Sequence, residues 1–304
     1  ASCPFLFVWD GERYRFLGDL LAASPPGLYI APGVYAECDT DEYVRVPEEW
    51  LSPRDGQYEI VVHECLREVT YLDQATLIAV DHPANVEVYP NERLSGPGPY
   101  PAYKLYAVRE RLAPRVALQY PVAGWALPGS SETPRPTSCL DALSTADDGL
   151  SVSDFPHLDV PGCGMPHAIE LEFADVPGDA ELVLLLHGYL KFPGSPSQYV
   201  AHERGLRFTM PNLQRLGADR EWETIVDNIG APAGFPRTIT VDLTGKLAAG
   251  VNRLRITTNM LVYWDWVSLG VVDSYADVRL TRVNAASAEL SQSGVPMMYR
   301  PCRR

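Results

Sequence analysis

Apolar and polar side chains alternate regularly between residues 237 and 267, and this pattern restricts the possible folds strongly. In its first part, Ile239, Val241 and Leu243 alternate with polar residues. In its second part, one parity is mostly apolar and the other is mostly polar. The mostly apolar parity comprises Leu254, Ile256, Thr258, Met260, Val262, Trp264 and Trp266. Because successive side chains of a strand point to opposite faces, the pattern predicts two β-strands that face one core, with their other face toward water or a ligand.

Shorter stretches of the same pattern recur along the chain, separated by Gly and Pro. Asp10-Gly11, between two aromatic-rich runs, predicts a hairpin. The 27 prolines among 304 residues disfavour long helices, because proline is excluded from helix interiors. No strand–helix alternation is visible. The sequence therefore predicts an all-β protein with two antiparallel β-sandwich domains, jelly-roll or immunoglobulin-like, and long irregular loops.

The division into two domains rests on one long segment. Residues 114–164 are rich in Pro, Ser and Gly, and a loop of that length inside one compact domain is unusual. We therefore expect an N-terminal β-domain over 1–113, an irregular connection over 114–164 and a C-terminal β-sandwich domain over 165–304.

The net charge of −14 argues against nucleic acid or an anionic membrane as a partner, because both attract clustered Lys and Arg. It is compatible with bound divalent cations or with a basic protein. No apolar run approaches the ~20 residues of a membrane-spanning helix, so we expect no transmembrane segment. The sequence begins with Ala1 and not Met, which is consistent with a leader already removed.

The six cysteines are scattered and form no C-x-x-C pair, which disfavours a zinc site or a redox dithiol. An even number in a β-rich chain fits up to three disulfides in an oxidising compartment. The predicted pairs are Cys38 with Cys65, Cys139 with Cys163, and Cys3 with Cys302. We therefore expect an extracytoplasmic protein, periplasmic, cell-surface or secreted. The alternative is a cytosolic protein with buried free thiols.

Two places are candidates for ligand or metal binding. Asp39, Asp41 and Glu42 lie in an expected loop, and loop carboxylates are common Ca²⁺ ligands. The alternative is an ordinary charged loop, and Ca²⁺ is the one cofactor that the sequence suggests. Tyr263 and Asp265 are expected on the face opposite the core tryptophans, where they could contact a ligand such as a carbohydrate.

The sequence offers no catalytic residue that we can assign. Six titratable side chains cluster in one stretch: His63, Glu64, Glu68, Asp73, Asp81 and His82. Glu64 and Asp73 could face each other across a hairpin as a paired-carboxylate site, but capping of turns and pairing with Arg67 on a solvated edge explain the cluster more simply. The run 184–188 (LLLHG) is similar to the strand that precedes the oxyanion loop of α/β-hydrolases. However, no G-x-S-x-G nucleophile motif accompanies it.

Five sequence segments together resemble a region found in bacterial proteins. They are CPFLFVWDGERYRFLGD (3–19), DEYVRVP (41–47), HECLREVTYLDQATLIAVDHP (63–83), IGAPAGFPRTITVDLTG (229–245) and RLRITTNMLVYWDWV (253–267). The region that they resemble is uncharacterised, occurs in large exported proteins, and lies near FG-GAP, tetratricopeptide or ASPIC/UnbV-type segments. The resemblance implies an exported β-rich module of a larger assembly, and it implies no catalytic residues.

Taken together, these features predict a non-enzymatic extracytoplasmic protein that binds or scaffolds, as a subunit of a surface or multi-protein assembly with other protein subunits as partners. One alternative is a carbohydrate-binding, Ca²⁺-stabilised, lectin-like module. A second alternative is a glycoside hydrolase with paired carboxylates about 5–10 Å apart.

Overall fold

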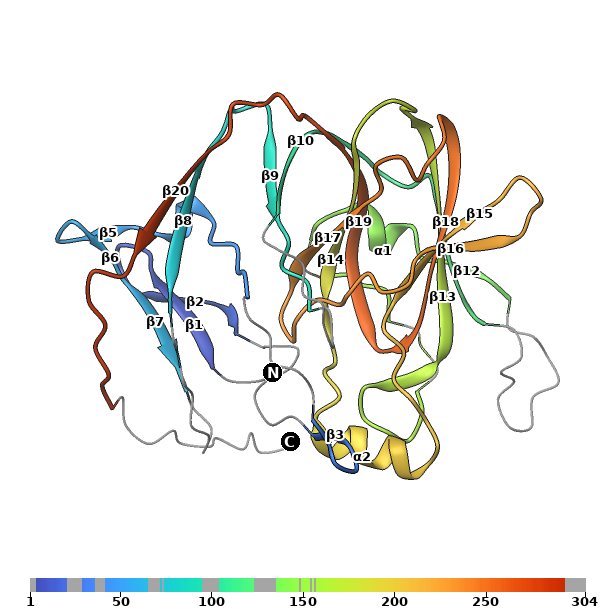
Figure 1. Ribbon diagram of the computed structural model, residues 1–304, viewed down its shortest axis with the longest axis horizontal. Coiled ribbons are helices and arrows are strands. Elements are labelled where there is room, and N and C mark those ends of the chain that lie inside the picture. Colours follow the sequence, from blue (N-terminus) through green and yellow to red (C-terminus); the bar gives the residue numbers. More distant parts are fainter. Residues whose placement is uncertain are drawn as a thin grey trace.

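The computed structural model describes residues 4–20, 29–35, 42–64, 72, 74–94, 104–122, 135–147, 149–153, 155 and 157–292. Within these ranges strands predominate (Figure 1), which confirms the all-β prediction. The helices of these ranges are short: η1 (Glu48–Trp50), α1 (Asp141–Ser144) and α2 (Ser195–Glu203).

Two large antiparallel sheets form the main body. The five-stranded sheet has the order β17-β14-β19-β10-β9, and the six-stranded sheet has the order β12-β11-β13-β18-β15-β16. The strands of the first are β9 (Glu87–Pro90), β10 (Leu105–Leu112), β14 (Leu182–Leu190), β17 (Arg237–Asp242) and β19 (Val262–Val272). Those of the second are β11 (Val116–Pro121), β12 (Thr137–Ser138), β13 (Cys163–Val176), β15 (Asn212–Leu216), β16 (Trp222–Val226) and β18 (Gly250–Met260).

One hydrophobic core joins the inner faces of these two sheets. Leu184 and Leu186 of β14 enter it from the five-stranded sheet, and Ile169, Leu171 and Ile256 enter it from the six-stranded sheet. Full burial of such side chains contributes about 1.5–3 kcal/mol each, so this core contributes strongly to stability. The two sheets therefore form a β-sandwich.

The predicted domain boundaries do not follow these sheets. β9 and β10 belong to the predicted N-terminal part, yet β10 pairs with β19 in the five-stranded sheet. The predicted connection 114–164 contains β11, which pairs with β13 along its whole length. Its Ala117 lies in the main core, so this segment is an integral part of the sandwich.

The N-terminal strands form a smaller sheet in place of the predicted second sandwich, as far as the described residues go. It has the order β2-β1-β7, with β1 (Phe5–Trp9), β2 (Tyr14–Asp19) and β7 (Ile60–His63). The predicted hairpin at Asp10-Gly11 is confirmed. Asp10 Oδ1 accepts hydrogen bonds from the backbone N–H of Glu12 and Arg13, and Gly11 adopts a φ of 102° that favours glycine.

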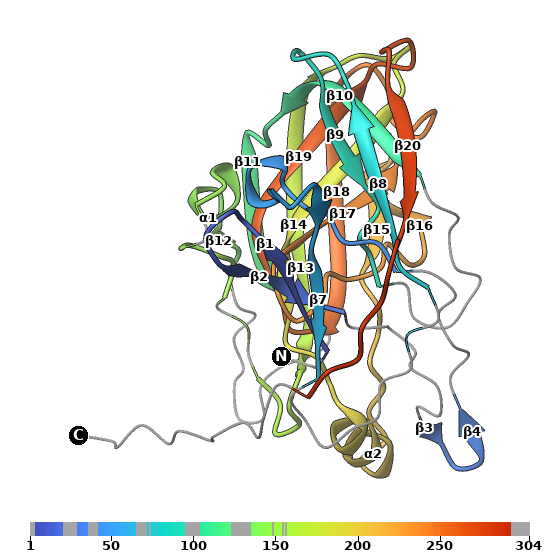
Figure 2. The ribbon, with the colours of Figure 1, turned by 90° about the vertical axis from the view of Figure 1, so that its left-hand side faces the viewer.

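Three two-stranded ribbons complete the fold of the described residues. They are β3 (Tyr29–Ala31) with β4 (Val34–Tyr35), β5 (Pro53–Arg54) with β6 (Gln57–Tyr58), and β8 (Thr76–Asp81) with β20 (Arg279–Asn284). The β8–β20 ribbon lies on the same side of the sandwich as the three-stranded sheet, in front of the sandwich in the second view (Figure 2). It links two segments that are about two thirds of the chain apart.

The second of the two strands predicted between residues 237 and 267 is divided into two strands in the structure. β18 ends at Met260 in the six-stranded sheet, and β19 begins at Val262 in the five-stranded sheet. The chain therefore passes from one sheet to the other at Leu261, which is fully buried in the main core. The alternation continues across this change because both strands face the same core.

A β-bulge then breaks the alternation in β19. His187 pairs with Trp266 and Gly188 pairs with Trp264, so Asp265 is the extra residue. Both tryptophans are buried, as the sequence predicts, but on opposite sides of the sheet. Trp264 lies in the main core, whereas Trp266 packs on the other face with Val183 and Leu185. The prediction that the two rings share one face is wrong, because a single inserted residue reverses the parity.

Gly188 permits this bulge. A Cβ at Gly188 would collide with the backbone carbonyl of Tyr263, and backbone cannot rotate away. We expect Gly188→Ala to lower the free energy of unfolding by about 1–3 kcal/mol, the usual cost of overpacking. Gly18→Ala is the matched control, since a Cβ there meets nothing within 4 Å. Urea unfolding of both variants tests this expectation, and an equal, small effect of both changes would contradict it.

Candidate functional site

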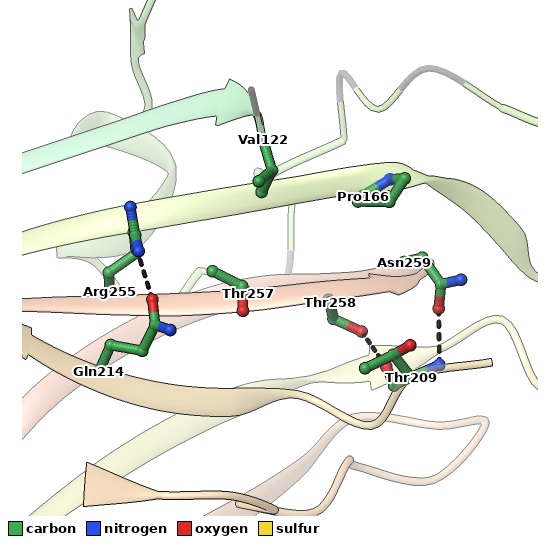
Figure 3. Close-up of a pocket in the computed structure, with 8 residues that line it drawn as sticks. All are labelled: Val122, Pro166, Thr209, Gln214, Arg255, Thr257, Thr258 and Asn259. Carbon is green, nitrogen blue, oxygen red and sulfur yellow. Dashed lines mark hydrogen bonds between the residues drawn. The ribbon is translucent and has the colours of Figure 1, made fainter. Parts of the chain in front are cut away.

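A small hollow lies on the outer face of the six-stranded sheet, away from the main core (Figure 3). Its volume is about 190 Å³. Strands β15 and β18 form its floor, and the ends of β11 and β13 form its far wall. The lining residues are Val122, Pro166, Thr209, Gln214, Arg255, Thr257, Thr258 and Asn259.

The alternation of β18 creates this surface. Leu254 and Ile256 enter the main core, so Arg255 and Thr257 point outward. On the neighbouring strand, Gln214 is paired with Arg255 and therefore shares its face. The same rule that builds the core thus places polar side chains together on the opposite side.

Arg255 is held in a fixed orientation. Its Nε donates a hydrogen bond to Oε1 of Gln214 at 2.7 Å, and its guanidinium carbon lies 4.3 Å from the ring centroid of Trp222. A cation over an indole ring contributes about 0.5–1 kcal/mol at an exposed site. Within the described part of the chain, the terminal N–H groups of Arg255 make no further hydrogen bond or ion pair.

The register partner of Arg255 on β13 is Glu170, but this carboxylate is engaged elsewhere. Arg253 donates to Glu170 Oε1, and the hydroxyl of Tyr120 donates to Glu170 Oε2 at 3.3 Å. Glu170 therefore does not neutralise Arg255, and the guanidinium group remains open toward the hollow.

The side of the hollow near Thr209 is made rigid by internal hydrogen bonds (Figure 3). Thr258 Oγ1 donates to the Thr209 carbonyl at 2.7 Å, and Asn259 Oδ1 accepts from the Thr209 N–H at 2.7 Å. Asn259 Nδ2 also donates to the Arg207 carbonyl at 2.7 Å. Thr258 and Asn259 thus fix the backbone at Thr209.

No protein-family model matches this chain, and no curated protein matches it. The resemblance noted above therefore stays a prediction.

Tyr263 and Asp265 do not form an open ligand surface. The Tyr263 ring stacks on that of Tyr189, with centroids 4.9 Å apart and an angle of 9° between the planes. Asp265 is buried at the bulge. The two residues therefore lack the shared exposed face that an uninterrupted alternation would provide.

Of the three proposed Ca²⁺ ligands, Asp39 and Asp41 lie outside the described residues. Glu42 Oε1 accepts a hydrogen bond from Arg237 Nη1 at 2.8 Å, so this carboxylate already has a cation beside it. In the described part of the chain, no group of three or more His, Cys, Asp or Glu side chains could hold a metal ion.

Cys139 and Cys163 are both buried and both free, so their predicted disulfide is wrong. Cys139 lies in the main core, whereas Cys163 packs in a separate cluster with Val160 and Ala201. Burial raises the pKa of the Cys139 thiol to about 11, which keeps it protonated and unreactive. Cys3, Cys38, Cys65 and Cys302 lie outside the described residues.

His187, from the hydrolase-like run, stands near the end of β14 as a packed polar residue. Its ring stacks on Trp266, with centroids 5.5 Å apart, and its Nδ1 lies 3.0 Å from Thr238 Oγ1. Asp73 lies outside the described residues, so the proposed paired-carboxylate site stays a prediction. No helix in the described ranges has the length and hydropathy to span a membrane.

The sequence did not single out Arg255, Gln214 or Thr209. One signal was available in the sequence: the alternate polar residues between 253 and 259 were expected to face water or a ligand. Only the pairing of β18 with β13 and β15 shows which outward side chains adjoin the hollow.

Proposed function

We propose that this protein is a non-enzymatic, extracytoplasmic binding module that works within a larger assembly. The hollow beside Arg255 is the observation that supports the binding role. Its lining offers one oriented guanidinium group, amides and hydroxyls beside apolar carbon, the mixture that polar small-molecule sites use. None of its eight lining residues is a carboxylate, histidine or cysteine, which favours binding over hydrolysis at this place.

A carbohydrate is the ligand class that this lining fits best. Sugars present hydroxyl groups on their edges and C–H groups on their faces, and the hollow offers partners for both. Binding of soluble oligosaccharides to the full chain, measured by a glycan array and then by calorimetry, tests the proposal. We expect Arg255→Ala to weaken binding at least tenfold, which corresponds to about 1.4 kcal/mol.

Arg282→Ala is the matched control, because Arg282 is exposed on β20, which is outside the six-stranded sheet. It should leave the affinity unchanged. Equal binding by the Arg255 variant and the natural protein would show that the hollow is not the binding site.

A second candidate function, scaffolding through protein contacts, is favoured by the N-terminal sheet. Five aromatic side chains gather on one face of it: Phe5, Phe7, Trp9, Tyr14 and Phe16. Tyr14 and Phe16 are 43% and 37% exposed. Aromatic residues are enriched at protein–protein interfaces.

Co-purification from the native host tests the scaffolding role. A subunit that accompanies the natural protein should be lost from the double variant Tyr14→Ser, Phe16→Ser. It should be retained by Tyr275→Ser, because Tyr275 is 99% exposed and lies far along the chain from this sheet. Fractionation of the host in the same experiment tests the extracytoplasmic location.

A further inference from the structure

The polar groups that the hollow leaves available are mainly hydrogen-bond donors. Gln214 Oε1 and Asn259 Oδ1, its two side-chain amide oxygens, already accept hydrogen bonds. Thr257 Oγ1 accepts from Asn212 Nδ2 at 2.7 Å, so its O–H remains to donate. In the described residues the Thr209 hydroxyl and the terminal N–H groups of Arg255 have no partner. A ligand that presents acceptors therefore matches these unused donors.

The guanidinium group is the strongest of these donors, and its shape selects among acceptors. Its planar fork donates two parallel hydrogen bonds to a carboxylate, an arrangement that a lysine cannot reproduce. The hydrogen bond to Gln214 and the packing on Trp222 hold the fork in place before a ligand arrives. Less side-chain entropy is then lost on binding.

The opposite wall of the hollow is apolar. Val122 and Pro166 stand across β18 from Gln214 and Thr209 (Figure 3). A pyranose ring has an apolar C–H face that suits such a wall, and its ring hydroxyls would lie within the range of Thr209 and Thr257. A bare inorganic anion would leave this wall without contacts.

The acidity of the whole protein does not prevent an anion from binding here. At an ionic strength of about 0.15 M, charges more than about 8 Å away are largely screened. The nearest carboxylate in the register, Glu170, is compensated by Arg253. The local field at the hollow is therefore dominated by Arg255.

We propose that this hollow binds the carboxylate-bearing ring of an acidic saccharide, with the guanidinium fork of Arg255 on the carboxylate. This inference rests on the proposed binding function and specifies its ligand. The Thr209 and Thr257 hydroxyls bind the hydroxyl groups of the ring, and Val122 and Pro166 cover its apolar face.

The test compares two matched sugars by calorimetry or by NMR titration of the full chain. One probe is an oligogalacturonate, and the other is its methyl ester, which has the same rings without the charge. We expect the acid to bind at least tenfold more tightly than the ester. Arg255→Gln should abolish this difference, and Arg255→Lys should retain only a small part of it, because lysine keeps the charge and loses the fork.

Thr209→Val provides a second variant that does not touch the cation. Its backbone contacts with Thr258 and Asn259 use main-chain atoms, so the fold should be preserved. It should weaken the acid and the ester by a similar factor. Arg282→Gln is the control for the charge change and should alter neither affinity.

The outcomes separate the inference from the function on which it rests. Equal binding of the acid and the ester, lost in Thr209→Val, would overturn the carboxylate assignment and keep the saccharide site. Binding of inorganic sulfate or phosphate as tightly as the oligogalacturonate would overturn the saccharide assignment. If neither sugar nor anion binds at millimolar concentration, the proposed function of the hollow fails as well.

Discussion

Replacing Arg237 with alanine is expected to lower the free energy of unfolding by about 3–5 kcal/mol, the cost of removing one partner from a buried ion pair. Arg237, at the start of β17, is only 3% exposed. Its Nη1 donates to Glu42 Oε1 at 2.8 Å, and its Nη2 donates to the backbone carbonyl of Asp19 and lies 3.6 Å from the Asp19 carboxylate. Asp19 is fully buried, so the variant would leave its charge in the interior without this cation.

The loss should also depend on pH. Burial raises the pKa of Glu92, and the charge of Arg237 holds that increase back. Removing the guanidinium group therefore raises the pKa of Glu92 further. In the unfolded chain this carboxyl ionises near its usual pKa of 4.5, whereas the folded variant resists ionisation. The stability lost in Arg237→Ala should thus be smallest below pH 4.5 and should grow as the pH rises above this value.

Urea unfolding of Arg237→Ala at pH 4 and pH 7 measures both the loss of stability and its dependence on pH. The slope of the unfolding free energy against urea concentration should stay the same as in the natural protein. Arg279→Ala is the matched control, since Arg279 is exposed on β20 and should change the stability by less than about 0.5 kcal/mol. A loss below about 1 kcal/mol in Arg237→Ala would mean that water reaches the cluster and solvates its carboxylates.

The second large effect concerns acid stability and a single histidine. His167 is buried in β13, and burial lowers its pKa to about 4 from a usual value of 6.5. Its Nδ1 lies 2.9 Å from the Met165 carbonyl, so the neutral ring donates there. Between these two pKa values the unfolded chain takes up a proton and the folded protein does not. Stability is therefore fully present above pH 6.5 and falls as the pH falls toward 4.

The size of this loss follows from the pKa difference. At about 1.36 kcal/mol per pKa unit, His167 should account for about 3 kcal/mol of stability lost between pH 7.5 and pH 4. We expect His167→Asn, which keeps a donor for the Met165 carbonyl and cannot take up a proton, to lose about 3 kcal/mol less over that range. Urea unfolding at pH 7.5 and pH 4 measures the loss for each protein. The comparison uses the change between the two pH values, so a different stability of the variant at pH 7.5 does not affect it.

His82→Asn is the control, because His82 is exposed beside β8 and lies outside the hydrophobic clusters. It should follow the natural pH profile. A His167→Asn profile as steep as that of the natural protein would show that other groups, such as the buried carboxylates, cause the acid instability.

The strands were predictable because their signal is local. Ile239 and Val241 enter the main core as the alternation predicts, because the period of two depends only on which side of a strand meets that core. The signal for the hairpin at Asp10-Gly11 is local as well. Neither inference needs to know which strand lies next to which. The expectation that the opposite face meets water or a ligand is wrong for β17, where Thr238 and Thr240 are buried as well.

The pairing of the strands was not predictable from these signals. β20 pairs with β8, and β10 pairs with β19, in each case across more than 150 residues. The predicted domain boundary does not match the sheets for this reason. Residues 114–164 have an irregular composition, and only the pairing of Val116–Pro121 with β13 shows that they contain a strand of the sandwich. The candidate site depends on the same pairing, because Arg255, Gln214 and Pro166 come from three strands.

The all-β class, the two-residue period of the strands and the hairpin turn could be inferred from the order of the residues, because each depends on neighbours along the chain. Three features could be seen only in the folded chain: the crossing between sheets at Leu261, the bulge at Asp265 that places two tryptophans on opposite faces, and the burial of Arg237. The physical reason is the same in each case. These features depend on contacts between segments that are distant in sequence. Such contacts produce no periodic pattern in the amino-acid sequence from which they could be predicted.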